Sequence, residues 1–170
     1  MRTAFVGATL LGVALLTAGV QNKTSSLEGK AAPAFSMKST DGKTVTNASL
    51  KGKVVLLDFW ATWCGPCKKA SPTMESLHKS LNAKGLTVIG VNVLEDTAGS
   101  GPAKKYKADH KYSFMFTYDA DAVATKMKIS GIPQFVLINR KGVIVDSWEG
   151  FDDKIKADME AKVKAEVAKK

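Results

Sequence analysis

Cys64 and Cys67 are the only cysteines of this chain, and a Gly-Pro dipeptide separates them. An apolar run precedes them and apolar residues at helical spacing follow, so the pair is predicted to open a helix. Unpaired backbone N–H groups and the helix dipole favour a thiolate at such an end. Cys64 is therefore the candidate nucleophile for thiol–disulfide exchange, and Cys67, one turn later, can resolve a mixed disulfide. Gly65 and Pro66 fix the turn without adding bulk.

Other interpretations of the cysteine pair remain open from the residues alone. A C-x-x-C pair can be half of a zinc site, but His78 and His110 lie at spacings unlike those of zinc modules. The pair could also be an inert local disulfide or a copper-binding pair. Two cysteines three positions apart do not make a scaffold held by several disulfides. We favour redox chemistry and expect no metal and no cofactor.

The segments around the cysteines alternate between strand and helix patterns, which predicts an α/β fold with a mixed central sheet flanked by helices. Residues 33–46 resemble a hairpin with an Asp-Gly turn. Nearly continuous apolar runs at 54–60 and 86–94 are typical of strands covered on both faces. The other expected elements are helices at 65–81, 101–111, 119–128 and 152–170, and strands at 114–117, 134–138 and 143–148.

Asp58 lies inside the apolar run at 54–60, six residues before Cys64. A buried carboxylate without a partner is costly and usually stays protonated. The alternative is an acid at a strand edge in contact with a lysine such as Lys53.

The first twenty residues differ from the rest of the chain. Arg2 precedes an uncharged run rich in small and apolar residues, in the order of a secretory signal. The run is also just long enough for a retained membrane anchor, but its glycines and threonines favour cleavage. We expect 1–20 to be a signal peptide or N-terminal anchor, 21–32 a linker and 33–170 one domain in the periplasm or on the extracytoplasmic face of the membrane.

The net charge of +9 raises the question of nucleic acid or an anionic membrane as a partner. The lysines are scattered, and many stand beside acids in the last expected helix. A solvated surface with a basic bias explains this pattern, so we expect no nucleic-acid binding. A membrane is an expected partner only if the N-terminal segment is retained.

The segment 58–67, DFWATWCGPC, resembles the active-site segment of the thioredoxin family. The hairpin, GKVVLL at 52–57, VNVLE at 91–95 with an inserted helix after it, and GIPQF at 131–135 are similar to the exported TlpA/ResA-like branch, also called AhpC/TSA-type or redoxin-like. The resemblance covers residue 33 to the C-terminus. It implies a thioredoxin fold with an N-terminal β-hairpin extension and one inserted helix, and thiol–disulfide oxidoreductase activity.

The resemblance also assigns roles to two acids. Asp58 matches a general base that exchanges the proton of Cys67 through water. The TlpA/ResA-like branch often lacks this acid and uses one at the position of Glu95. This chain has both, so we take Glu95 as a second candidate for tuning the thiols; its alternative is a solvent-facing loop acid beside Asp96.

The Ile132-Pro133 bond matches the position of a cis X-Pro bond that faces the disulfide in this family. It would leave the backbone of Ile132 free to pair with a substrate strand; an ordinary trans proline at a strand start is the alternative. Trp63, beside the nucleophile, is expected to be a partly exposed contact surface. Together with Gly65 and Pro66, these residues form the expected substrate-binding surface.

The Gly-Pro dipeptide resembles that of reducing thioredoxins rather than that of strong oxidants. An exported reductant needs recharging, so the resemblance implies a membrane thiol reductase as electron donor. It implies disulfide-containing protein substrates, the haem-binding cysteines of apocytochrome c in cytochrome c maturation among them. The alternatives are a redoxin-type thiol peroxidase, whose peroxidatic loop residues 62–65 do not resemble, and a copper-binding thioredoxin-like module.

Overall fold

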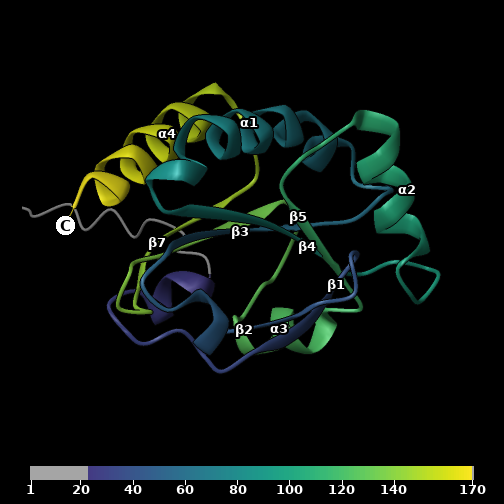
Figure 1. The fold of residues 1–170 in the computed structure, drawn as a ribbon, viewed down its shortest axis with the longest axis horizontal. Coiled ribbons are helices and arrows are strands. Elements are labelled where there is room, and N and C mark those ends of the chain that lie inside the picture. The colour runs from purple at the N-terminus through teal and green to yellow at the C-terminus, as the bar shows by residue number, and fades with distance from the viewer. Residues whose placement is uncertain (1–22, 170) are drawn as a thin grey trace, which may run out of the picture.

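The computed structural model describes residues 23–169, so the expected signal peptide or anchor at 1–20 lies outside the described residues. The elements, shown in Figure 1, are η1 (Lys23–Leu27), β1 (Ser36–Ser39), β2 (Thr44–Thr46), η2 (Ala48–Leu50), β3 (Val54–Trp60), α1 (Gly65–Leu81), η3 (Asn82–Lys84), β4 (Leu86–Asn92), α2 (Gly101–His110), β5 (Met115–Tyr118), α3 (Asp121–Lys126), β6 (Gln134–Ile138), β7 (Ile144–Glu149) and α4 (Asp153–Ala168).

The strands form one mixed sheet in the order β2-β1-β5-β4-β3-β6-β7. β3 pairs in parallel with β4, and β4 in parallel with β5, while the other neighbours are antiparallel. The two long apolar runs are thus neighbouring central strands, and the prediction that each forms a strand covered on both faces is confirmed. The α/β thioredoxin-like fold is confirmed, with the N-terminal hairpin at one edge of the sheet and α2 inserted between β4 and β5.

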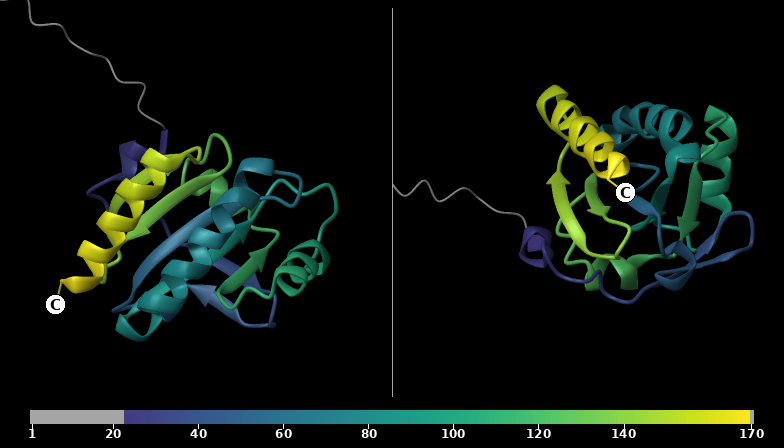
Figure 2. Two further views of the ribbon diagram at one scale, coloured as in Figure 1. Left: turned by 90° about the horizontal axis from the view of Figure 1, so that it is seen from above. Right: turned by 60° about the vertical axis from the view of Figure 1, so that its left-hand side comes forward.

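Helices cover both faces of the sheet. Figure 1 shows α1 and α4 on one face and α3 on the other, and Figure 2 shows α1 and α4 side by side. Successive side chains of a strand point to opposite faces. Accordingly Leu56 and Trp60 of β3 pack in the core under α1 and α4, whereas Leu57 and Phe59 pack in the core toward α3.

Several elements are shorter than the sequence predicts, because non-glycine residues adopt left-handed backbone conformations at their ends. α3 spans 121–126 rather than 119–128, and Asp119 (φ 50°) and Lys128 (φ 56°) lie just outside it. β4 ends at Asn92 rather than at residue 94, where φ of Leu94 is 56°. Such conformations are uncommon outside glycine and leave little trace in hydrophobic periodicity.

The described part of the expected linker packs against the domain. Thr24 of η1 is fully buried, and its hydroxyl accepts a hydrogen bond from the side chain of Gln134 at 2.7 Å and lies 3.1 Å from the carbonyl oxygen of Met127. The amide of Gly29 donates to the carbonyl of Ile144 at 2.8 Å. The segment therefore contacts the residue that follows α3 and the last two strands.

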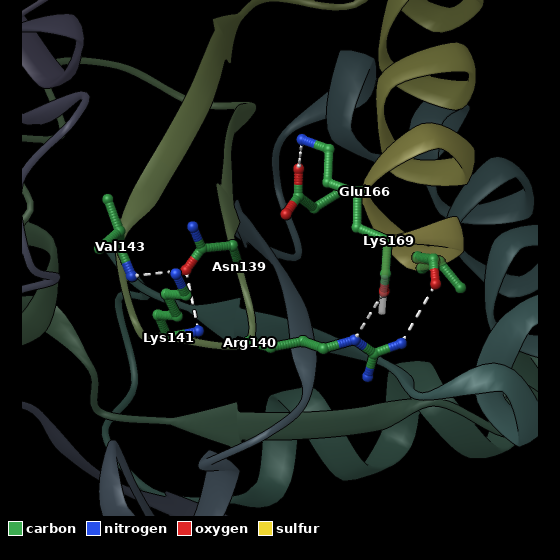
Figure 3. Close-up of polar contacts among 7 residues, drawn as sticks. Asn139, Arg140, Lys141, Val143, Glu166 and Lys169 are labelled. Atoms are coloured by element: carbon green, nitrogen blue, oxygen red, sulfur yellow. Dashed lines mark hydrogen bonds and ion pairs between the residues drawn. The ribbon is translucent and has the colours of Figure 1, made fainter.

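Arg140, in the β6–β7 turn, ties together the end of the sheet far from the cysteines (Figure 3). Its guanidinium donates to the carbonyl oxygens of Val167 at 3.1 Å and Lys169 at 3.3 Å. It also donates to the carbonyl oxygen of Lys84 at 3.3 Å. A cation here satisfies carbonyl groups that the C-terminal end of α4 leaves free. The side-chain oxygen of Asn139 closes the turn by accepting two backbone N–H groups, each at 3.0 Å.

Candidate active site

Cys64 and Cys67 form a disulfide at the N-terminus of α1, with S–S 1.99 Å and Cα–Cα 5.3 Å. Cys64 is the N-cap residue in an extended conformation, and its Sγ accepts a hydrogen bond from the backbone N–H of Cys67 at 3.2 Å. The sulfur thus takes the place of the side-chain oxygen that usually caps a helix. No acid lies in the first turn of α1, so the helix end offers its positive potential to this sulfur unopposed by a carboxylate of that turn.

The two sulfur-bearing residues differ in their surroundings. Cys67 is fully buried and Cys64 is 3% exposed, whereas Trp63, Gly65 and Pro66 around them are exposed. Of the two cysteines, Cys64 is the one that keeps some exposure, and it stands between the exposed Trp63 and Gly65. The exposure of Trp63 is as expected from the sequence, and substrate binding by Trp63, Gly65 and Pro66 stays a prediction.

Strand alternation directs Asp58 toward the cysteines. Asp58 has the same parity on β3 as Leu56 and Trp60, whose core cluster contains both Cys64 and Cys67. β3 lies between β4 and β6, and the residues paired with Asp58 there are Gly90 and Phe135. The alternative of an acid at a strand edge beside Lys53 is therefore wrong.

The surroundings of Asp58 favour a protonated carboxyl group. Asp58 is 1% exposed, and its buried Oδ1 has no hydrogen-bond partner among residues 23–169. Burial raises the pKa of Asp58 to about 8, because an apolar environment disfavours the charged form. This acid thus holds a proton at neutral pH and can give it up or take it back within the physiological range.

Glu95 holds the loop that precedes the disulfide. Its carboxylate accepts hydrogen bonds from the backbone N–H and the hydroxyl of Thr62 and from the side chain of Asn92, all at 2.6 Å. Glu95 is half-buried, so the alternative of a solvent-facing loop acid is wrong. Sequence analysis missed Thr62 and Asn92; a polar residue at the end of the apolar run of β4 was the available signal for Asn92.

The Ile132-Pro133 peptide bond is cis, as the resemblance implies. Ile132 packs against the core cluster that contains both cysteines. Its backbone N–H and carbonyl make no hydrogen bond within the described part of the chain, since pairing in β6 begins at Gln134. A free main-chain edge is thus available at this position.

Comparison with known proteins places this geometry in a family. Residues 27–164, which include every site residue described above, match the family model described as Redoxin. The chain belongs to the Redoxin family.

Relatives of this Redoxin protein have names that state thiol–disulfide chemistry. It is 35% identical over 136 residues to thiol-disulfide oxidoreductase ResA of Bacillus subtilis (strain 168), covering 79% of this chain and 74% of ResA. It is 32% identical over 134 residues to thiol:disulfide interchange protein DsbE of Pseudomonas fluorescens biotype C, covering 77% and 71%. This Redoxin protein is a thiol–disulfide oxidoreductase.

A solved structure agrees with the fold. The crystal structure of a thiol:disulfide interchange protein of the thioredoxin family from Chlorobium tepidum TLS superposes with a TM-score of 0.70 at 29% identity, covering 81% of this Redoxin chain and 96% of that one.

Within residues 23–169, none of the helices is both long and apolar enough to span a bilayer. In the same range, no three His, Cys, Asp or Glu side chains gather in a way that could hold a metal ion.

Proposed function

We propose that this Redoxin protein reduces disulfides of polypeptides outside the cytoplasm. The observation that carries the proposal is the position of Cys64 as the N-cap of α1, where its sulfur accepts the N–H of Cys67. In the reduced protein the Cys64 thiolate attacks a substrate sulfur, forms a mixed disulfide and releases the other substrate sulfur as a thiolate. Cys67 then attacks Cys64, and the substrate leaves with both electrons.

Asp58 is the proposed acceptor of the Cys67 proton, through water, during this second step. The step needs the ionised form of Asp58, which a pKa of about 8 leaves in roughly a tenth of the molecules at pH 7, and it ends with an oxidised pair and a protonated Asp58. Recharging by a thiol donor returns the proton to Cys67. Glu95 acts on the thiols as a positioning residue, since it holds Thr62 two residues before Cys64.

The proposed electron donor is a membrane thiol reductase, because an exported reductant must be reduced again. The proposed substrates are polypeptides with unwanted disulfides, including the haem-binding cysteines of apocytochrome c. The exposed Trp63 and the unpaired backbone of Ile132 support a polypeptide rather than a small molecule as substrate.

A redox titration tests the proposed direction of electron flow. We expect a midpoint near that of thioredoxin, about −270 mV, because the residues between the cysteines are those of reducing thioredoxins. Thiol alkylation followed by mass spectrometry at a series of dithiothreitol ratios measures the Cys64–Cys67 couple, and Cys67→Ser serves as a control without an intramolecular couple. A midpoint above about −180 mV, in the range of disulfide isomerases and oxidants, would overturn the direction.

A further inference from the structure

The exposed apolar surface next to the disulfide has a feature that disulfide exchange alone does not require. Across residues 23–169, the exposed large hydrophobic side chains are Trp63 (55%) and Leu94 (53%). The indole N–H of Trp63 donates to the carbonyl oxygen of Leu94 at 2.7 Å, so the two residues lie together. Trp63 directly precedes Cys64. An exposed apolar pair at the reactive turn is typical of an interaction site.

The backbone of Leu94 adds an independent observation. Its φ of 56° is a left-handed conformation that glycine adopts freely and a side chain makes unfavourable. Hydrogen bonds fix this conformation. The N–H of Leu94 donates to Asp121 at 2.9 Å, and its carbonyl oxygen accepts from the indole of Trp63. The next residue, Glu95, binds Thr62. Neither backbone preference nor core packing explains a leucine here, and strain of this kind is concentrated at functional sites.

We infer that Trp63 and Leu94 form a binding surface for an apolar side chain that flanks the reactive cysteine of a polypeptide substrate. The inference rests on the proposed function, since a mixed disulfide with Cys64 brings the neighbouring residues of the substrate close to Trp63. Substrate main chain pairs with Ile132, and the apolar side chain is removed from water against Leu94 and the indole. The surface thus selects among substrates by the residue beside their cysteine.

The substitution Leu94→Gly separates recognition from folding. It removes the side chain and also relieves the unfavourable backbone conformation, so the thermal midpoint should stay the same or rise. Two peptides with one intramolecular disulfide each, which differ only in Leu or Ser beside the attacked cysteine, serve as substrates. Hydroxyethyl disulfide serves as a substrate too small to reach the surface.

We expect the kcat/KM of wild type for the Leu peptide to be about fivefold that for the Ser peptide, which corresponds to about 1 kcal/mol. Leu94→Gly should lose this preference, because its kcat/KM should fall for the Leu peptide and stay unchanged for the Ser peptide. Its kcat/KM for hydroxyethyl disulfide should equal that of wild type. Lys111→Gly, which replaces another left-handed residue (φ 55°) at the end of α2, is the matched control and should keep the preference.

Equal kcat/KM values for both peptides in wild type would overturn the inference, as would an equal loss of Leu94→Gly on all three substrates. A lower thermal midpoint of Leu94→Gly would assign Leu94 a packing role and also overturn it. If sedimentation shows a dimer for wild type and a monomer for Leu94→Gly, the surface binds a second copy of the chain rather than a peptide. That result would overturn the inference as well. Failure of wild type to reduce either peptide would reject the proposed function itself.

Discussion

Replacing Cys64 by Ser reduces the rate of polypeptide disulfide reduction to that of uncatalysed exchange. A serine hydroxyl at the N-cap still accepts the N–H of residue 67, so the helix end and the fold remain intact. The hydroxyl is not ionised near neutral pH and cannot replace sulfur in thiol–disulfide exchange. Reduction of insulin by dithiothreitol, followed as turbidity, measures the loss.

Cys67→Ser is the matched variant for this experiment. It keeps the nucleophile but cannot resolve the mixed disulfide, so covalent complexes with substrate should accumulate and turnover should stop. Mass spectrometry of these complexes identifies the attached sulfur. Substrate bound through Cys67 in Cys64→Ser, at a rate like that of Cys64 in the other variant, would contradict the assigned order of attack.

Replacing Asp58 by Asn stabilises the oxidised protein at pH 7 by roughly 4 kcal/mol. Below pH about 4 the carboxyl group is protonated in both the folded and the unfolded chain and contributes nothing. Between pH 4 and 8 the unfolded chain ionises while the folded protein keeps its proton, because burial raises the pKa to about 8. The stability of wild type therefore falls by up to about 1.4 kcal/mol per pH unit, and levels off above pH 8.

Urea unfolding of both proteins at pH 5, 6, 7 and 8 measures this difference. The gap between Asp58→Asn and wild type should widen with pH. Asp109→Asn removes an exposed acid that pairs with Lys105, and should change stability by less than about 1 kcal/mol at every pH. A constant gap from pH 5 to 8 would show that Asp58 is already ionised in the folded protein.

In the reduced protein, the asparagine side chain of Asp58→Asn cannot accept the Cys67 proton, so disulfide exchange should slow by about 100-fold.

The sequence predicted most of the features that rest on local patterns. The cysteine pair at a helix start and the two central strands follow from hydrophobic periodicity. The parity of Asp58 on its strand places it on the face of the cysteines once α1 is known to cover that face. These features need only short-range information, which the chain carries in runs of a few residues.

The features that escaped prediction depend on contacts between distant positions. Glu95 was a candidate, but its bonds to Thr62 span 33 residues, and those of Thr24 to Gln134 span 110. Such pairs form only after the strands are in register. The left-handed conformation of Leu94 is likewise imposed by Trp63 and Asp121, and a leucine after an apolar run reads as one more strand residue.

The rate of Cys64 alkylation as a function of pH tests the central claim most directly. In reduced Cys67→Ser, iodoacetamide reports on one thiol, and its rate follows the thiolate fraction. A sulfur ionised by the start of α1 should give an apparent pKa at least about one unit below the ordinary value of about 8.5. A rate that keeps rising through pH 9, as for an unactivated thiol, would contradict the role of Cys64 as the nucleophile of this oxidoreductase.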